Sequence, residues 1–197
     1  MGLEGSANWN AILDSAEDIL REEGYGALTS RRIAERIGIK QRLIYYYFHT
    51  MDDLIVRTFR RLAERDLQRL ARTLASVRPL HEVWHFCINT TDARLISEFM
   101  ALANRIEPLR TEVISYIEET RRIQVAALKQ AMKRAGSKSS LSPVAGVLLA
   151  TSLGLTLVRE AELGVNTGHN EVGAFIRQFL AEIEPLPKTR LPGARKG

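Results

Sequence analysis

The sequence predicts an all-α protein, and three observations support this fold class. Apolar residues recur at helical spacing along almost the whole chain, and no segment shows the sustained alternation of a half-buried strand. Glycine and proline fall between the periodic segments, where helices end or begin. The 197 residues, 45% of them hydrophobic, are enough to bury a sizeable core. We therefore expect a small N-terminal helical bundle followed by a larger one.

The N-terminal part of the chain predicts three helices. The first is expected over about 8–23 and stops at Gly24, because glycine readily adopts the conformation that ends a helix. Thr29 is placed to cap a second helix, which ends at Gly38. A third helix, over about 40–48, follows after almost no connection. A longer helix before two short ones joined by a tight glycine-containing turn is the helix-turn-helix arrangement.

Six further helices are predicted downstream, separated by proline and glycine. They cover about 52–77, 80–90, 92–105, 108–135, 143–163 and 169–184. We expect two domains, with residues 1–50 forming the helix-turn-helix and residues 51–184 the larger bundle. The remaining segment, 185–197, contains basic residues and no acid, which is typical of a disordered basic tail.

The last two predicted helices form the most apolar part of the chain. Residues 139–158 carry no charge and are long enough to span a bilayer, although serine and threonine dilute the run. The final helix is amphipathic, with apolar residues on one face and charges opposite, which favours a soluble bundle over a membrane protein. We predict that a stripe of small residues and an apolar face of the final helix form a homodimer interface. The candidate residues are Gly146, Ala150, Gly154, Phe175, Ile176 and Phe179.

The predicted helix-turn-helix contains a local cluster of positive charge, although residues 1–50 as a whole carry six Lys or Arg against seven Asp or Glu. The net charge is +5, and much of it comes from the C-terminal tail. Within the cluster, the only acidic residue is Glu35. The cluster consists of Arg31, Arg32, Arg36, Lys40 and Arg42. Cations at the start of a helix oppose its dipole, at a cost of about 0.3–1 kcal/mol each. Because DNA phosphates beside these helix ends would reverse that sign, the pattern indicates a nucleic-acid partner.

The stretch LIYYYF places three of the five tyrosines in a row. On a helix, Ile44 and Phe48 share a face, which is expected to pack on the two preceding helices. Tyr45, Tyr46 and Tyr47 then fan around the other sides, where a phenol is long enough to reach a phosphate oxygen. The alternative is that one tyrosine belongs to the core and the others are ordinary surface residues.

Residues 9–54 resemble the DNA-binding domain of the TetR (tetracycline-repressor-like) family of bacterial regulators. The resemblance rests on the segments EEGYGALT and IAERIGI, together with the spacing of Tyr45, Phe48 and Leu54. It implies a homodimeric, ligand-responsive repressor that binds an inverted-repeat operator. It also implies a cytoplasmic protein with no cofactor and no catalytic residue, whose effector is unknown.

The resemblance assigns roles to residues of the helix-turn-helix. Base readout is implied for Lys40, Gln41, Arg42 and Tyr46. Phosphate contacts are implied for Thr29, Arg31, Arg32, Tyr45 and Tyr47. The amide of Gln41 suits adenine and the guanidinium of Arg42 suits guanine, each pairing worth roughly 1–3 kcal/mol of discrimination.

The chain departs from the family pattern at four positions. Lys40 stands where a serine usually caps the recognition helix, and Arg42 where a small residue is frequent. Arg32 replaces a frequent acid, while Met51 replaces a lysine that touches the DNA backbone. The three added cations are expected to compensate for the missing lysine.

The middle helices of this family enclose an effector pocket, and the resemblance places candidate lining residues there. They are Trp84, His85, Asn89, Phe99, Met100, Asn104, Val113, Tyr116 and Ile117. A competing motif overlaps them, since HEVWH (81–85) has the H-E-x-x-H spacing of zinc proteases. Only His49 and His169 remain as further histidines, and no spaced Glu or His completes the ligand set. We predict no metal site, and the single cysteine, Cys87, excludes an intramolecular disulfide.

Overall fold

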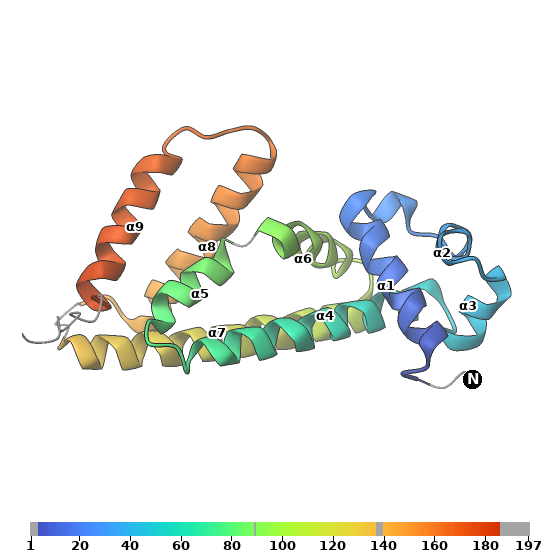
Figure 1. Cartoon of the computed structure of the whole chain (residues 1–197), viewed down its shortest axis with the longest axis horizontal. Coiled ribbons are helices and arrows are strands. Elements are labelled where there is room, and N and C mark those ends of the chain that lie inside the picture. The colour runs from blue at the N-terminus through green and yellow to red at the C-terminus, as the bar shows by residue number, and fades with distance from the viewer. Residues whose placement is uncertain (1–3, 89, 137–139, 186–197) are drawn as a thin grey trace, which may run out of the picture.

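The computed structural model describes residues 4–88, 90–136 and 140–185. Within these ranges the chain is helical and has no strand, so the predicted fold class is confirmed (Figure 1). The helices are α1 (Ala7–Glu22), α2 (Ser30–Ile37), α3 (Gln41–Tyr47), α4 (Met51–Thr73), α5 (Pro79–Cys87), α6 (Thr90–Leu102), α7 (Glu107–Ala135), α8 (Pro143–Glu162) and α9 (His169–Ile183), with a 3-10 turn η1 (Tyr25–Ala27) after α1. The basic tail predicted at 185–197 lies almost wholly outside the described residues.

Local capping explains the boundaries of the first three helices. Thr29 Oγ1 accepts a hydrogen bond from the amide of Arg32 at 3.1 Å, so it caps α2 as predicted. Gly38 ends α2 with a φ of 69°, in the left-handed region that favours glycine. Lys40 occupies the N-cap position of α3 and makes no side-chain capping bond there. The start of α3 therefore combines an uncapped helix end with a cation.

The long helix α4 ends at Thr73, before the end predicted near residue 77. The amides of Leu74, Ala75 and Ser76 bond to carbonyls three residues earlier, which is the tightening that commonly closes a helix. Pro79 then opens α5, because proline is tolerated in the first turn. The predicted end was too late because the helical spacing of apolar residues continues past Thr73, where the helix ends.

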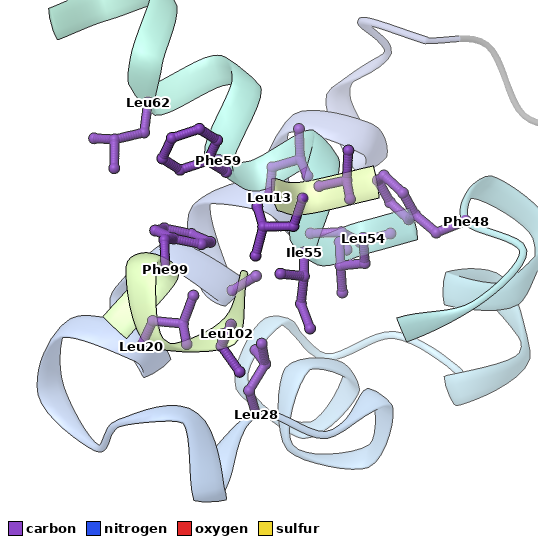
Figure 2. Packing of buried hydrophobic residues seen from close by; sticks show 14 of the residues in the cluster. Leu13, Leu20, Leu28, Phe48, Leu54, Ile55, Phe59, Leu62, Phe99 and Leu102 are labelled. Atoms are coloured by element: carbon purple, nitrogen blue, oxygen red, sulfur yellow. The ribbon is translucent and has the colours of Figure 1, made fainter. Parts of the chain in front are cut away.

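The larger core joins the helix-turn-helix to the first part of the bundle (Figure 2). Phe48, Phe59 and Phe99 are fully buried, and the rings of Phe59 and Phe99 lie 5.1 Å apart. Residues from α1, α2, α3, α4, α6 and α7 contribute to this core, so it crosses the domain boundary predicted at residue 50. Each such side chain stabilises the fold by about 1.5–3 kcal/mol through burial. The helix-turn-helix is therefore packed onto the bundle through shared apolar contacts.

A smaller core holds α9 against α5 and α7. It consists of Leu80, Ala127, Ala131, Ile176 and Leu180. The buried carboxylate of Glu184 accepts hydrogen bonds from the amides of Leu80 and His81, at 3.0 and 3.3 Å. These amides lie in the first turn of α5, where a carboxylate is favoured by the helix dipole. The end of α9 is thus tied to the start of α5.

A buried carboxylate also connects α1 to α4. Glu17 is 5% exposed and lies 2.5 Å from Arg65, 3.3 Å from Arg61 and 3.0 Å from Arg21. Burial raises the pKa of Glu17, but the hydrogen bonds and charges of these arginines outweigh it and leave the pKa below its usual value. Because α4 packs along α7 in the bundle (Figure 1), Glu17 links the helix-turn-helix to a helix of the bundle.

Candidate nucleic-acid interface and interior pocket

Helices α2 and α3 are joined through one buried hydroxyl group. Ser30, 5% exposed, accepts a hydrogen bond from Nε2 of Gln41 at 2.8 Å. The same Oγ lies 3.0 Å from the hydroxyl oxygen of Tyr45. The side chains of two residues predicted to contact DNA are therefore held by a third. Sequence reasoning missed Ser30, because a serine beside a capping threonine carries no signal of its own.

Most of the predicted basic cluster is neutralised within the chain. Arg31 pairs with Glu35, Arg32 with Glu23 and Arg36 with Glu22, each at 2.8 Å. All of these side chains are at least partly exposed, so the pairs are weak individually, at about 0–1 kcal/mol. The sequence places only Glu35 among these arginines, since the acids of α1 come near α2 only through the fold.

Lys40 and Arg42 differ from the other cations of the cluster. Both are exposed at the start of α3, and among the described residues neither has an acidic side chain within 4.0 Å. Within the described part of the chain, neither charge is therefore offset by a carboxylate. The start of α3 is thus the place where the helix-turn-helix presents uncompensated positive charge.

The three tyrosines of α3 divide into two groups. Tyr45 and Tyr46 are 48% and 54% exposed, as a contact to a partner requires. Tyr47 is 8% exposed, and its ring packs edge-on to Trp9 at 6.3 Å between centroids. The ring of Tyr47 is therefore part of the core, which was the alternative for one tyrosine. Its predicted phosphate contact concerns the hydroxyl group alone and stays a prediction.

A pocket of about 100 Å³ lies between α4, α5, α6, α7 and α8. Its lining includes Met100, Tyr116 and Ile117 among the predicted effector residues. The hydroxyl of Tyr116 donates to Oδ2 of Asp66 at 3.4 Å, and Asp66 itself is 4% exposed. Burial, followed by the negative charge of Asp66, raises the pKa of Tyr116 well above its ordinary value. The pocket therefore contains charged and polar groups in a poorly solvated setting.

The other predicted effector residues need correction. Phe99 and Val113 are buried in the larger core, and Trp84 packs against the smaller one. His85 and Asn104 are exposed and do not line the pocket. Asn89 lies outside the described residues. Sequence position placed these residues on middle helices, but it did not specify which helical face meets the pocket.

The prediction missed most of the polar lining of the pocket. These residues are Asp66, Arg69, Thr120, Arg121, Gln124 and Thr151. A polar residue within an apolar helical period is the signal that could have found them, since Asp66 and Gln124 are almost fully buried.

Comparison with known proteins identifies the helix-turn-helix. Residues 12–58 match the family described as bacterial regulatory proteins, tetR family. The chain belongs to the TetR family.

Relatives of this TetR-family protein are transcriptional regulators. It is 26% identical over 142 residues to an uncharacterized HTH-type transcriptional regulator in the dhlA 5' region of Xanthobacter autotrophicus, across 64% of this chain and 68% of that protein. Over 46 residues it is 37% identical to the tetracycline repressor protein class A from transposon 1721 of Escherichia coli, which covers 23% of this chain and 21% of the repressor. The protein is a DNA-binding transcriptional regulator.

Solved structures share the fold of this TetR-family regulator. The reduced form of NemR from Escherichia coli superposes with a TM-score of 0.72 at 15% identity, covering 86% of this chain and 95% of that one. KstR2 of Mycobacterium tuberculosis, a ketosteroid transcriptional regulator, has a TM-score of 0.64 at 18% identity and covers 89% and 95%. The likeness extends from the helix-turn-helix through the bundle.

The HEVWH segment of the regulator packs at the junction of α5 and α9. His81 Nδ1 lies 3.0 Å from the carboxylate of Glu184, and its other ring nitrogen contacts Arg78. In the described part of the chain, no three His, Cys, Asp or Glu side chains are grouped so that they could hold a metal ion. One motif histidine is thus engaged by the carboxylate of Glu184, which follows α9 and is not part of the motif.

The predicted dimer stripe of the regulator faces inward, which corrects that assignment. A Cβ atom on Gly154 would lie 2.9 Å from the carbonyl oxygen of Cys87, and one on Gly146 would lie 3.0 Å from Leu128 Cδ2. Ala150 lies between them on the same side of α8. These small residues let α8 approach α5 and α7 of its own chain, and Ile176 is likewise buried in the smaller core.

An apolar surface remains on the outward side of α8 and on α9. The exposed apolar side chains are Val144, Leu148 and Leu149 on α8 and Phe175 and Phe179 on α9, and together we call them the α8–α9 face. Phe175 is 66% exposed, and its ring stacks on that of Phe179 at 6.5 Å between centroids. Among the described helices, α8 is the one whose length and apolar composition would allow it to cross a membrane.

Proposed function

We propose that this TetR-family regulator is a ligand-responsive repressor that binds an inverted-repeat operator as a homodimer. We also propose that it is a cytoplasmic protein without catalytic activity. The observation that carries the proposal is the uncompensated charge of Lys40 and Arg42 at the uncapped start of α3. Phosphates and base edges in the major groove would supply the negative partners that the chain does not.

Base readout is assigned to Lys40, Gln41, Arg42 and Tyr46. Ser30 takes one N–H of Gln41, which leaves the second N–H and the carbonyl oxygen of that amide for an adenine. We therefore add Ser30 as a positioning residue for Gln41. Arg42 is assigned to a guanine, because its fork of donors matches O6 and N7.

Phosphate contacts are assigned to Thr29, Arg31, Arg32, Tyr45 and Tyr47. Thr29 accepts the capping bond from Arg32, so its hydroxyl proton is free to donate to a phosphate oxygen. Arg31 and Arg32 exchange their intrachain carboxylate partners for phosphates on binding. Because those pairs are exposed and weak, the exchange costs little.

The homodimer is assigned to the α8–α9 face in place of the small-residue stripe. Exposed leucine and phenylalanine side chains on α8 and α9 are typical of a surface that another chain covers. A second copy related by a two-fold axis is the simplest partner, since such an axis pairs the same face of both chains. The same axis would present two copies of α3 to the two halves of an operator.

Regulation by a ligand follows from the position of the pocket. Asp66 and Arg69 belong to α4, whose earlier turns hold α1 through Glu17. A ligand that moves this part of α4 would therefore change the placement of the helix-turn-helix. The two copies of α3 in the dimer would then no longer match the spacing of the operator.

Selection of bound fragments from random duplex DNA tests the proposal. We expect enriched sites to contain two inverted half-sites whose centres lie about 34–36 Å, or a multiple, apart. Enriched sites without dyad symmetry, or no enrichment above non-specific binding, would contradict it. A promoter reporter carrying the selected site should then show lower transcription when the regulator is present, as a repressor requires.

A further inference from the structure

The pocket is small for a ligand site. Its volume is about 100 Å³. Pockets for drug-sized ligands span about 300–1,000 Å³, and a cavity of about 150 Å³ accommodates benzene. The pocket therefore suits a molecule of about six non-hydrogen atoms unless the surrounding helices move.

The charged groups that line the pocket sum to one positive charge. Asp66 and Arg69 form an ion pair at 3.3 Å and offset each other. Arg121 also lines the pocket, and among the described residues it has no acidic side chain within 4.0 Å. Tyr116 and Cys87 are neutral at pH 7, because burial raises the pKa of both, to about 11 for Cys87. The pocket would therefore repel a cationic ligand, and a ligand with one negative charge would neutralise the lining.

Buried polar groups in the pocket have spare hydrogen-bonding capacity. Gln124 is 3% exposed, yet its Nε2 donates to the thiol sulfur of Cys87 at 3.4 Å, a weak bond that leaves the second N–H for a ligand. The buried Oγ1 of Thr120 interacts with Tyr116 but makes no hydrogen bond of normal geometry. Gln124 lies three residues after Arg121 and four after Thr120 on α7, and all three side chains line the α7 side of the pocket. Donors for an oxyanion are thus collected on one side.

The remaining lining is apolar and comes from α5, α6, α7 and α8. It consists of Phe86, Ile96, Met100, Ile117 and Leu155. Such a wall favours a hydrocarbon body and disfavours a sugar or other polyhydroxyl compound, whose polar groups would lose their hydrogen bonds to water.

We propose that the effector is a small organic monocarboxylate with an apolar body. Its carboxylate meets Arg121, Gln124 and Thr120, and its hydrocarbon part lies along Met100 and Phe86. This inference rests on the proposed ligand-responsive function and specifies the chemistry of the ligand. An acid of this size would also lie beside the Asp66–Arg69 pair on α4, which connects the pocket to the helix-turn-helix.

Calorimetry on the full chain without DNA tests the inference with three matched probes: butyrate, butyramide and butylammonium. We expect butyrate to bind at least tenfold more tightly than either of the others. Arg121→Gln should abolish this preference, whereas Arg121→Lys should retain part of it. Arg122→Gln is the matched control, because Arg122 is exposed and pairs with Glu119, and it should bind butyrate like the parent.

Several outcomes would overturn the inference. These are equal binding of butyrate and butyramide, no binding of butyrate, or an unchanged preference in Arg121→Gln. Thermal unfolding of each variant distinguishes loss of the binding site from loss of the fold. Should Arg121→Gln fail to fold, the binding preference of Arg121→Lys is the deciding measurement. Duplex binding measured without any acid tests the proposed function separately: intact DNA binding with no acid preference defeats this inference alone.

Discussion

The helix-turn-helix and the α8–α9 region expose aromatic side chains in different ways. In the first region, Phe48 is fully buried, and the exposed aromatics Tyr45 and Tyr46 end in hydroxyl groups. In the second region, Phe175 is 66% exposed and Leu149 is 62% exposed, and neither carries a polar group. The first region completes its own core and keeps polar contacts for a partner. The second region leaves apolar surface that a single chain does not cover.

Removing one phenyl ring in each region should destabilise the fold to very different extents. Phe48→Ala should lower the free energy of unfolding by about 3–5 kcal/mol, because it empties a site stacked on Trp9 at 4.2 Å. Phe175→Ala should lower it by less than about 0.5 kcal/mol at low protein concentration, where association contributes least. Urea denaturation measures both. Equal losses would mean that Phe175 belongs to the fold of the single chain.

A charge placed on the α8–α9 face should break the dimer. For Phe175→Asp we expect a folded monomer by sedimentation and a loss in operator affinity of about 100-fold, in the range of a central interface residue. Ile114→Asp is the control, because Ile114 is 49% exposed on α7, outside the face. A dimeric Phe175→Asp protein with full affinity would remove the face from the proposed interface.

Substituting Arg42 and, separately, Arg36 distinguishes an arginine that reads a base from one that pairs within the protein. Arg42→Ala should cost roughly 1–3 kcal/mol on the best operator and relax preference at one base pair, because it removes a bidentate contact. Arg36→Ala should leave base preference unchanged, since that guanidinium is held by Glu22. Isotherms on matched and scrambled duplexes at one salt concentration measure the difference. If Arg42→Ala weakens both duplexes equally, Arg42 is a phosphate anchor.

The link between α1 and α4 should depend on pH. The folded-state pKa of Glu17 is lowered below its ordinary value, so its contribution to stability is present above that value and is lost as pH falls through the folded pKa. Glu17→Gln should lower the free energy of unfolding at pH 7 by about 1–3 kcal/mol, with the deficit shrinking below about pH 4.5. Asp14→Asn, an exposed partner of Arg61, is the control. A deficit that does not change with pH would show that the Glu17 charge is not the cause.

The smallest expected effect concerns the hydroxyl that holds Gln41. Ser30→Ala should cost about 1 kcal/mol on the best site, with reduced discrimination at the base that Gln41 reads, because the amide loses its support. In a Gln41→Ala background the same substitution should have little further effect on discrimination. Additive losses in the double variant would mean that Ser30 acts independently of Gln41, through Tyr45 or through a DNA contact of its own.

Features that depend on a few neighbouring residues were predictable. The caps at Thr29 and Gly38, and the helical fold, follow from hydrogen bonds and spacing within about one turn. The helix-turn-helix at 9–54 was recognisable because its signals lie close together along the chain. The predicted end of α4 was wrong, because the apolar period continues past Thr73 although the hydrogen bonds change.

Which residues meet across the molecule was decided only by the tertiary structure. Glu184 accepts a hydrogen bond from Leu80, which lies 104 positions earlier in the chain, and Arg65 bonds to Glu17 across 48 positions. The glycine stripe of α8 has the same spacing whether it faces a partner chain or α5, and contact with Cys87 decides for α5. The sequence by itself therefore determined the helices and the DNA-binding motif, because short-range geometry specifies them. The pairing of the arginines, the burial of Tyr47 and the lining of the pocket required the fold, because a helical period defines a face and leaves open what that face meets.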